Sequence, residues 1–313
     1  MTGQMRKQRQ IGPYTVVTRL DSGSTAPGAA PPEHRFIARS PDGDRTVLVG
    51  TPLATTDAQR FMTEADTARY LVGPWILPTT ELAAHGDRPW HARPYLPALP
   101  LPTALSVYGG TLPERTVRAL GVALAETLAV LHGQQLAHAG ICPAAVLLAA
   151  DGPRLTCFGA VRAAAPDGTP RREVPGLDAG SLPPEQAAGG QPRPMGDVYA
   201  LGATLAYAAT GHTAPAREEL PPVLRSIVPR CLARDPAHRP QLVELIEVLA
   251  EHGVQVPADS SPGTRAEALL TPGWLPAPVV AALAHQSAAV LSAEIQLPPQ
   301  PRAPAPAVAL PGH

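Results

Sequence analysis

The residue types that could do chemistry gather in the stretch from Leu136 to Gly159, LAHAGICPAAVLLAADGPRLTCFG. Its two thiols, Cys142 and Cys157, could form a redox pair or bind a soft metal, but a cysteine pair without further thiol or imidazole ligands usually serves as two small buried hydrophobes. Its carboxylate, Asp151, falls in a turn between two short apolar segments and is poorly placed for magnesium, which needs several oxygen ligands. We therefore expect this stretch to form part of the buried apolar core rather than a reactive site.

The composition limits the partners and the chemistry of the chain. A length of 313 residues allows about two globular units, or one two-lobed domain with a tail. Lys+Arg 25 balance Asp+Glu 26, so no general field would draw the chain to nucleic acid or to an anionic membrane. Lys7 is the only lysine, which excludes any mechanism that needs a lysine in the folded body.

The cysteines and the apolar runs point to a cytoplasmic location. Three cysteines, Cys142, Cys157 and Cys231, are an odd number without paired spacing, which favours a reducing compartment over a disulfide framework. The N-terminus MTGQMRKQRQ has no apolar segment typical of a signal peptide. No apolar run reaches the roughly 20 residues that cross a bilayer, so we expect no membrane insertion.

The part of the chain from residue 11 to residue 97 is predicted to be rich in β-strands. Alternation and β-branched residues predict strands at 11–20, 35–40 and 46–50, with two more in 75–97. Between them, residues 57–71 place Phe61, Ala65 and Ala68 on one helical face.

Residues 98–252 have helical patterns after a Pro-rich connection. Thr111 and Glu114 match a capping box ahead of a long apolar stripe, and residues 196–210 are apolar on nearly every face, as in a helix at the centre of a core. Two amphipathic helices are predicted near 223–233 and 241–251.

The two ends of the chain have a different composition. Residues 1–10 are expected to be flexible. In 253–313 we expect a linker, an amphipathic helix at 277–294 and a disordered Pro/Ala-rich tail, which could be plain linker or a proline-rich ligand for a partner.

Three motifs in order carry a family resemblance: PPEQA at 183–187, GDVYALG at 196–202 and CLARDPAHRP at 231–240. With these motifs, residues 11–250 resemble the serine/threonine protein kinase family, particularly its bacterial, actinobacterial-like branch. The resemblance implies an α+β, two-lobed fold, with a small antiparallel β lobe that carries one helix and a larger helical lobe.

The resemblance also implies structural roles for a set of buried residues. Asp197 would bind backbone amides of the catalytic loop, and Arg239 would pair with Glu185. His138 and Phe158 match positions of an internal hydrophobic spine.

The positions that would bind nucleotide in the family have changed type. The Gly-rich loop aligns on DSGSTA, which keeps Gly23 but places Asp21 at another glycine position, where a carboxylate would repel phosphate. The phosphate-binding lysine falls on Gly50. Glu64, the helix glutamate that would pair with that lysine, is left with no partner on the strand.

The catalytic positions have changed as well. Phosphoryl transfer depends on positioned magnesium and on a carboxylate that orients the hydroxyl group. The degenerate positions of the catalytic loop and of the metal-binding aspartate are Gly140, Cys142, Ala145 and Cys157, and Ala139 replaces the loop arginine.

The remaining nucleotide cleft is predicted to be closed. Leu48 replaces the small residue that roofs the adenine space, Leu147 supplies the floor and Leu96 lies in the hinge. Arg93 falls at the back of the pocket. We expect a collapsed, apolar cleft, a vestigial site made of Gly23, Leu48, Glu64, Leu96 and Leu147.

These changes favour a pseudokinase, a catalytically inactive kinase-like domain that regulates or binds another protein. No cofactor is expected, no magnesium site is expected, and ATP binding is possible but not favoured. Two alternatives remain: a serine/threonine kinase with weak or unconventional ATP binding and phosphotransfer, and a domain that binds nucleotide through the hinge backbone and Arg93 without catalysis.

Overall fold

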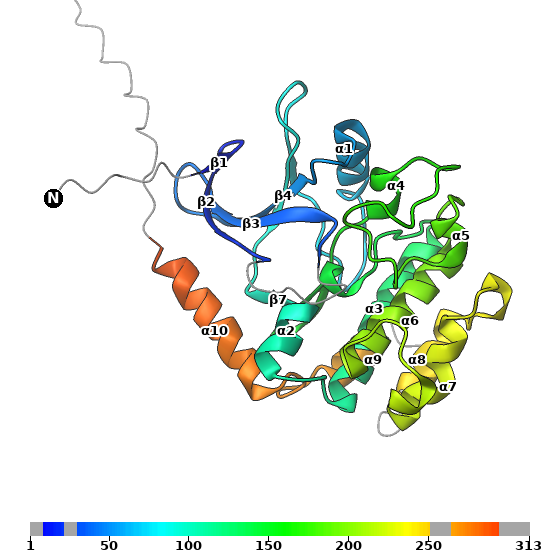
Figure 1. The fold of residues 1–313 in the computed structure, drawn as a ribbon. Helices are drawn as coiled ribbons and strands as arrows, with labels where there is room; N and C mark the ends of the chain where they lie inside the picture. The colour runs from blue at the N-terminus through cyan, green and yellow to red at the C-terminus, as the bar shows by residue number, and fades with distance from the viewer. Residues whose placement is uncertain (1–8, 22–29, 251–263, 294–313) are drawn as a thin grey trace, which may run out of the picture.

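The chain folds into two lobes of α+β architecture, described here from a computed structural model (Figure 1). The structure describes residues 9–21, 30–250 and 264–293. Most of the predicted flexible N-terminus, the linker and the Pro/Ala-rich tail lie outside the described residues. The curled antiparallel sheet and the helical lobe agree with the predicted two-lobed, protein-kinase-like fold.

The smaller lobe is a six-stranded antiparallel sheet with strand order β1-β2-β3-β4-β6-β5. The predicted strand at 11–20 is two strands in the structure, because the chain reverses at Gly12, whose φ of 55° suits glycine. The strands are β1 (Gln10–Ile11), β2 (Tyr14–Arg19), β3 (Glu33–Arg39), β4 (Thr46–Pro52), β5 (Glu81–Leu82) and β6 (His91–Pro94).

Alternate residues of β3 and β4 face two different clusters. Phe36 and Val49 pack with Tyr14 and Trp90 in an outer cluster. Ile37 and Leu48 pack on the other side, toward the larger lobe. This alternation follows from the pleat of a strand, and it turns every second residue of β3 into the cleft between the lobes.

Helix α1 (Ala58–Thr67) lies beside the sheet and begins at Asp57, whose carboxylate accepts a hydrogen bond from the amide of Arg60 at 2.8 Å. It ends earlier than the predicted residue 71, with Ala68 as its C-cap. Phe61 and Ala65 are buried as the periodicity predicts.

A second, three-stranded sheet lies below the hinge and consists of β7 (Ala98–Pro100), β8 (Val146–Ala149) and β9 (Gly152–Leu155). Helix α2 (Leu101–Tyr108) follows β7 directly. The Pro-rich segment 97–102, expected as a plain connection, thus contains a strand and the start of a helix. Proline is tolerated at the end of β7 and in the first turn of α2, where no intrahelical amide bond is lost.

Two long helices form the core of the larger lobe. Helix α3 (Glu114–Gly133) begins after Pro113 without a side-chain cap, so the predicted capping box at Thr111 and Glu114 is wrong. Among the described residues α3 is the one helix long and apolar enough to be a candidate membrane span, and 72% of that stretch is buried in the fold. Helix α6 (Pro194–Thr210) packs against α3 and ends at Gly211, at φ 83°.

The remaining helices cover this core, and α10 reaches from the larger lobe toward the smaller one (Figure 1). Helix α9 was not predicted, and α10 ends before the predicted residue 294. The bounds are α4 (Ala160–Ala164), α5 (Pro184–Ala187), α7 (Pro222–Cys231), α8 (Leu242–Ala250), α9 (Thr264–Leu269) and α10 (Ala277–Leu291), with 3-10 turns at Pro143–Ala145, Arg217–Glu219 and Pro236–His238.

Candidate functional site

The catalytic-loop segment is held by the carboxylate of Asp197, at the start of α6. Its oxygens accept hydrogen bonds from the backbone amides of His138 at 2.7 Å and Ala139 at 2.9 Å. Nε2 of His132 lies 2.9 Å from the same carboxylate. Asp197 is 1% exposed, so these three contacts satisfy a charge that burial would otherwise strand.

A second contact joins the buried Arg239 to Glu185 of α5, whose side chain is 32% exposed. The guanidinium meets the carboxylate in a two-pronged pair, with nitrogen to oxygen distances of 2.6 and 2.8 Å. Arg239 also donates to the carbonyls of Ala233 and Met195. The pair ties the end of the activation segment to the segment before α8, where a planar guanidinium can serve several acceptors at once.

His138 and Phe158 contact each other edge to face, with ring centroids 5.6 Å apart and planes at 86°. Both rings are buried. Burial lowers the pKa of His138 to about 4, so the imidazole is neutral at physiological pH. The ring therefore packs as part of the core, and nothing in this geometry presents it as a base to a substrate.

Gly140, at the catalytic aspartate position, packs against the backbone of Cys157. A β-carbon at Gly140 would overlap the carbonyl oxygen of Cys157 and lie 3.0 Å from its carbonyl carbon. Ala139 and Cys157 both have positive φ angles, 53° and 63°. Residues with a β-carbon rarely adopt this region, and the strain persists only where the surroundings impose it. The backbone path is thus tightly fixed, and it leaves no room for a side chain at residue 140.

The two thiols lie in one small buried cluster with Ala144 and Ala145. Burial raises the pKa of Cys142 to about 12, and burial together with the charge of Glu33 raises the pKa of Cys157 above its usual range. Both groups therefore remain protonated thiols at neutral pH. A thiolate is the form that binds metals and reacts with oxidants, so this environment favours the role of small hydrophobes.

Gly50, at the lysine position on β4, has its side-chain space taken by neighbours from other strands. A β-carbon there would overlap the imidazole of His91 on β6 and lie 2.8 Å from Oε2 of Glu33 on β3. Nε2 of His91 contacts Oε2 of Glu33 at 2.7 Å, and Arg93 donates to Oε1 at 2.8 Å. A buried triad of Glu33, His91 and Arg93 therefore occupies the place where the lysine would lie.

Within this triad the negative charge of Glu33 is compensated by the positive charge of Arg93. Burial alone would raise the pKa of Glu33, but the charge of Arg93 and the hydrogen bonds from Arg93 and His91 outweigh it and hold the pKa well below its usual range. Burial and the nearby Arg93 lower the pKa of His91. Glu33 is therefore ionised, His91 neutral, and Arg93 the counter-ion.

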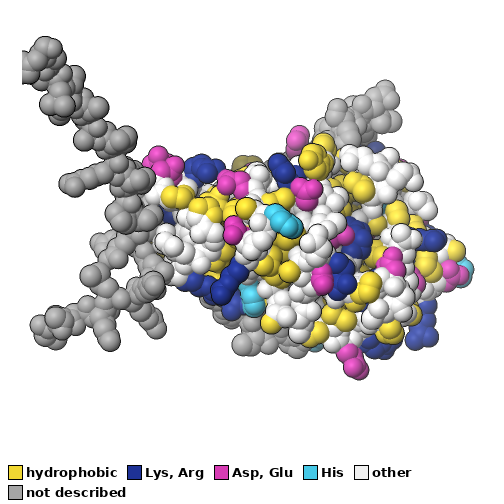
Figure 2. Space-filling view, turned by 90° about the horizontal axis from the view of Figure 1, so that it is seen from above, with side chains coloured by type: hydrophobic (Ala, Val, Ile, Leu, Met, Phe, Trp, Pro, Cys, Tyr) yellow, Lys and Arg dark blue, Asp and Glu magenta, His cyan; other side chains and the backbone are white. Residues whose placement is uncertain are grey.

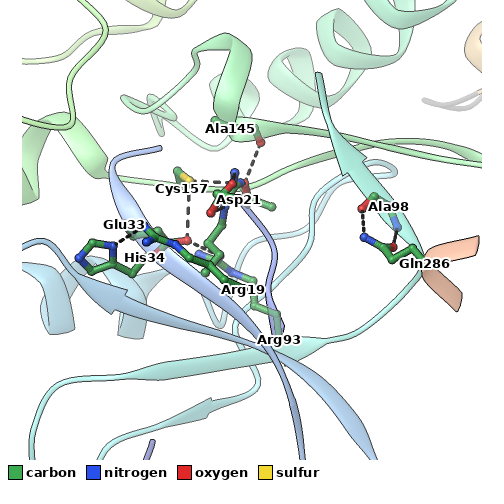
Figure 3. Close-up of polar contacts among 11 residues, drawn as sticks. Arg19, Asp21, Glu33, His34, Arg93, Ala98, Ala145, Cys157 and Gln286 are labelled. Carbon is green, nitrogen blue, oxygen red and sulfur yellow. Dashed lines mark hydrogen bonds and ion pairs between the residues drawn. The ribbon is translucent and has the colours of Figure 1, made fainter. Parts of the chain in front are cut away.

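A second charged pair belongs to the smaller lobe and lies at the cleft, where its arginine contacts the larger lobe. Arg35 of β3, which is 0% exposed, forms a two-pronged ion pair with Asp21, and its Nε lies 3.1 Å from Oδ2. It also donates to Oγ1 of Thr156 in the larger lobe at 3.4 Å, and Thr156 in turn donates to the carbonyl of Ala145 at 2.7 Å (Figure 3). Asp21, which the alignment placed in the Gly-rich loop, thus serves as the partner of a buried arginine.

These charges correct the prediction of an apolar cleft. The inner part contains Arg35, Asp21, Glu33 and Arg93, which pair with one another. Sequence reasoning missed Glu33, Arg35 and His91. The one available signal was that Glu33, Arg35 and Ile37 are alternate residues of a strand, which places two charges on the same face as a buried apolar side chain.

The outer part of the cleft is filled with apolar side chains. The roof residue Leu48 and the floor residue Leu147 belong to the same buried cluster, with Leu96 of the hinge packed against it. Leu48 is 3% exposed and Leu147 is 2% exposed. Gly23, the remaining residue of the predicted vestigial site, lies outside the described residues.

Glu64 has a partner that was not foreseen from the sequence. Its carboxylate pairs with Arg162 of α4, whose Nε lies 2.9 Å from both oxygens, and Arg162 also donates to the carbonyl of Ala137 at 3.1 Å. Arg60, on the same helix, donates to the carbonyl of Ala163 at 3.3 Å. Helix α1 is therefore held by α4 of the larger lobe rather than by a lysine of β4.

The face of the molecule that is seen from above carries no single sign of charge. Figure 2 shows acidic and basic side chains interspersed on the face seen from above, with apolar side chains between them. This distribution agrees with the near-zero net charge of −1, and on this face it gives no electrostatic footprint for a polyanion.

These features define a protein-kinase-like domain. They are the two lobes, the carboxylate of Asp197 beneath the catalytic-loop backbone, and the pair of Arg239 with Glu185.

Comparisons with known proteins agree with this class. No family model matches the chain. The chain is 33% identical over 265 residues to the probable serine/threonine-protein kinase PkwA of Thermomonospora curvata, a match that covers 77% of this chain and 34% of that protein. It is 30% identical over 319 residues to the serine/threonine-protein kinase AfsK of Streptomyces griseus, covering 94% and 37%. The serine/threonine-protein kinase PknK of Mycobacterium tuberculosis is 32% identical over 250 residues, covering 69% and 22%.

These homologues, at 30 to 33% identity, support membership of the chain in the protein kinase family. The chain spans 37% or less of the length of each of these relatives.

Proposed function

We propose that this domain is a pseudokinase, a kinase-like fold that does not transfer phosphate and that regulates another protein through binding. The observation that carries the proposal is the packing of Gly140 against the carbonyl of Cys157, which leaves no space for a catalytic carboxylate. The degenerate positions are therefore not isolated substitutions. At Gly140 and Gly50 the neighbouring backbone and side chains occupy the space that a side chain would need.

The proposal extends to the cofactor. The family's metal-binding positions carry Ala145 and Cys157, which lack the oxygen ligands that magnesium requires. The lysine position is Gly50, and its space is filled by His91. Arg93 is held by Glu33. We infer that the domain binds neither magnesium nor ATP with useful affinity, and that its partner is a protein.

Elements that usually change position in a switchable kinase are fixed here by internal contacts. Helix α1 is tied to α4 by Glu64 and Arg162. The activation segment is pinned by Arg171, which is 0% exposed and donates to the carbonyls of Ala165 and Gly190. A rigid, preformed surface suits a binding module, because little ordering entropy is lost on association.

A thermal-shift titration tests the cofactor part of the proposal. The full chain is heated with ATP alone, with magnesium or manganese alone, and with each metal and ATP together. A ligand that binds the native state raises the melting temperature with concentration. We expect no shift from the metal and ATP together beyond that from the metal alone. A clear metal-dependent shift on addition of ATP would contradict the closed cleft.

Labelled-phosphate transfer tests the enzymatic part. We expect no incorporation into the chain itself or into a generic protein substrate. The alternative is a kinase with weak or unconventional phosphotransfer. It is favoured by the fact that the relatives are named as serine/threonine-protein kinases. Under that alternative, transfer should be measurable and should rise in the Cys157→Asp variant. Under the proposal the variant stays inactive, because the introduced carboxylate would lie beside the buried Glu33.

A further inference from the structure

Helix α10 is firmly attached to the larger lobe at its N-terminal end. Just before the helix, Trp274 is buried, and its Nε1 donates to the carbonyl of Ala150 at 2.9 Å. The carbonyl of Trp274 accepts a hydrogen bond from Oγ1 of Thr116 on α3 at 2.6 Å. Leu275 is buried beside it. This root joins α10 to the same core that holds the two long helices.

The rest of α10 presents one narrow face to the protein. The residues on that face are Val279, Leu283, Gln286 and Val290, which follow one another at spacings of four, three and four. This spacing is that of an amphipathic helix seated in a groove. Other positions of the helix are exposed, among them Val280, which is 43% accessible.

The side chain of Gln286 forms hydrogen bonds with the backbone of the hinge segment. Its Oε1 accepts a hydrogen bond from the amide of Ala98, and its Nε2 donates to the carbonyl of the same residue, each at 3.0 Å (Figure 3). The hydroxyl of Tyr95 donates to Oε1 at 3.3 Å. The pairing of one side-chain amide with both groups of one peptide residue fixes the register of α10 against β7.

At Val290 the helix packs against the residues of the cleft. It is buried in the same cluster as the roof residue Leu48 and the floor residue Leu147. Its carbonyl accepts a hydrogen bond from Arg39 of β3 at 2.8 Å. A cation at the last turn of a helix satisfies a free carbonyl and opposes the negative end of the helix dipole. The tip of α10 thus contacts the smaller lobe, whereas its root belongs to the larger one.

We propose that the C-terminal half of α10 is a releasable helix that occupies a helix-binding groove along the hinge. The proposed groove consists of members of the buried cluster that also contains Val290, contributed by both lobes and by the hinge strand: Leu20, Ile37, Leu48, Ala98 and Leu147. While bound, the helix closes this side of the cleft and joins the two lobes. Its occupant is α10 of the same chain, and this inference holds whether or not the domain transfers phosphate.

The contrast between the two ends supports the release. The root is held by a buried tryptophan and two hydrogen bonds to the core. The tip makes four hydrogen bonds, three through Gln286 and one from Arg39, but it buries a single apolar side chain, Val290, where the root buries Trp274, Leu275 and Val279. Segments with few buried contacts open at lower free energy than the cores of the lobes. Release would therefore leave both lobes folded while it frees the hinge backbone and the roof of the cleft.

Hydrogen exchange on the full chain tests the proposal. The amide of Ala98 reports on the groove directly, since Gln286 accepts its hydrogen bond. Val290→Asp places a charge in the apolar cluster, and Gln286→Glu sets a carboxylate against the carbonyl of Ala98. The matched control is Val280→Asp, the same substitution as the first at an exposed position of the same helix. We expect exchange at Ala98 to rise at least about tenfold in the first two variants and to stay unchanged in the control.

Two results would overturn the proposal. One is unchanged exchange at Ala98 in Val290→Asp, which would mean that the tip does not depend on its apolar contact. The other is a rise at Ala98 matched by an equal rise across the buried amides of α3, which would mean that α10 cannot leave without unfolding the larger lobe. A rise confined to the hinge strand and to α10 supports the proposal.

Discussion

The imidazole of His91 lies where a side chain at Gly50 would begin. A β-carbon at Gly50 would overlap the ring and would come within 2.8 Å of Oε2 of Glu33. The two residues face each other across the neighbouring strands β4 and β6. The glycine at the lysine position is therefore tied to this histidine, and the two residues are expected to tolerate change only together.

Restoring the lysine should damage the fold without restoring nucleotide binding. We expect Gly50→Lys to lower the free energy of unfolding by about 1 to 3 kcal/mol or more, because an overpacked core forces side chains off their rotamers. Urea denaturation measures the loss. The double variant Gly50→Lys, His91→Ala should recover part of it, since the ring is removed and the new ammonium can pair with Glu33.

Gly133→Ala is the control for that experiment, because a β-carbon at Gly133, in the last turn of α3, meets nothing within 4 Å. It should leave stability unchanged or raise it by up to about 1 kcal/mol. A Gly50→Lys protein as stable as the parent, with a melting temperature that rises on addition of ATP and magnesium, would contradict the packing argument.

Gly140 should be equally intolerant, for a different reason. Its neighbour is the backbone carbonyl of Cys157, which cannot rotate away as a side chain can. We expect both Gly140→Ala and Gly140→Asp to cost about 3 kcal/mol or more, and neither to gain phosphotransfer. Gly110→Ala, with open space around its β-carbon, is the matched control. Equal stability of the Gly140 and Gly110 variants in urea would show that the loop can relax.

The parts of the fold that the sequence predicted are those governed by local patterns. The central helix at 196–210 was recognised from its apolar faces and from Gly211, which ends it in the structure. The short strand β7 was not recognised, because its residues pair with β8, a strand that comes after α2 and α3 in the chain. Pairing of that kind leaves no periodic signal in a single sequence.

The sequence predicted which residues of the candidate site are missing, but it did not predict which neighbouring residues take their place. The substitutions at Gly50 and Gly140 are visible in the sequence, but the neighbours that fill their space are not. Glu64 was expected to have no partner on the strand, and its partner is instead Arg162 of α4, 98 residues later, which the sequence did not indicate. Burial of a charge depends on a partner brought in by the fold, so composition and spacing alone could not have found Arg35.

The pair of Arg35 and Asp21 should depend strongly on both members. With one partner removed, the other remains as a buried, uncompensated charge, at a cost of about 3 to 5 kcal/mol. We therefore expect Asp21→Asn and Arg35→Met each to destabilise the chain by about that amount in urea unfolding. The double variant should cost less than the sum of the two, because no stranded charge remains.

The exposed pair of Arg230 and Glu244 offers a comparison within the same chain. Its side chains are 48% and 41% accessible, and surface ion pairs contribute about 0 to 1 kcal/mol. Arg230→Met should therefore have little effect. If Arg35→Met proved as mild as Arg230→Met, the charges in the cleft would have to be hydrated rather than buried.

The buried His138 should make the fold sensitive to mild acid. Burial lowers its folded pKa to about 4, whereas the ordinary value is 6.5, so the unfolded chain takes up the proton first. The groups that act on its charge are Asp197, which favours protonation, and Arg162, Arg93 and His132, which oppose it. This contribution to stability is complete above about pH 6.5 and is lost as the pH falls toward 4. From pH 7 to pH 5 the loss should be about 2 kcal/mol.

Urea unfolding at a series of pH values measures this loss of stability, with His138→Leu as the comparison. The variant should be less stable at pH 7 but should lose less between pH 7 and pH 5, and parallel losses in the two proteins would contradict a neutral, buried imidazole.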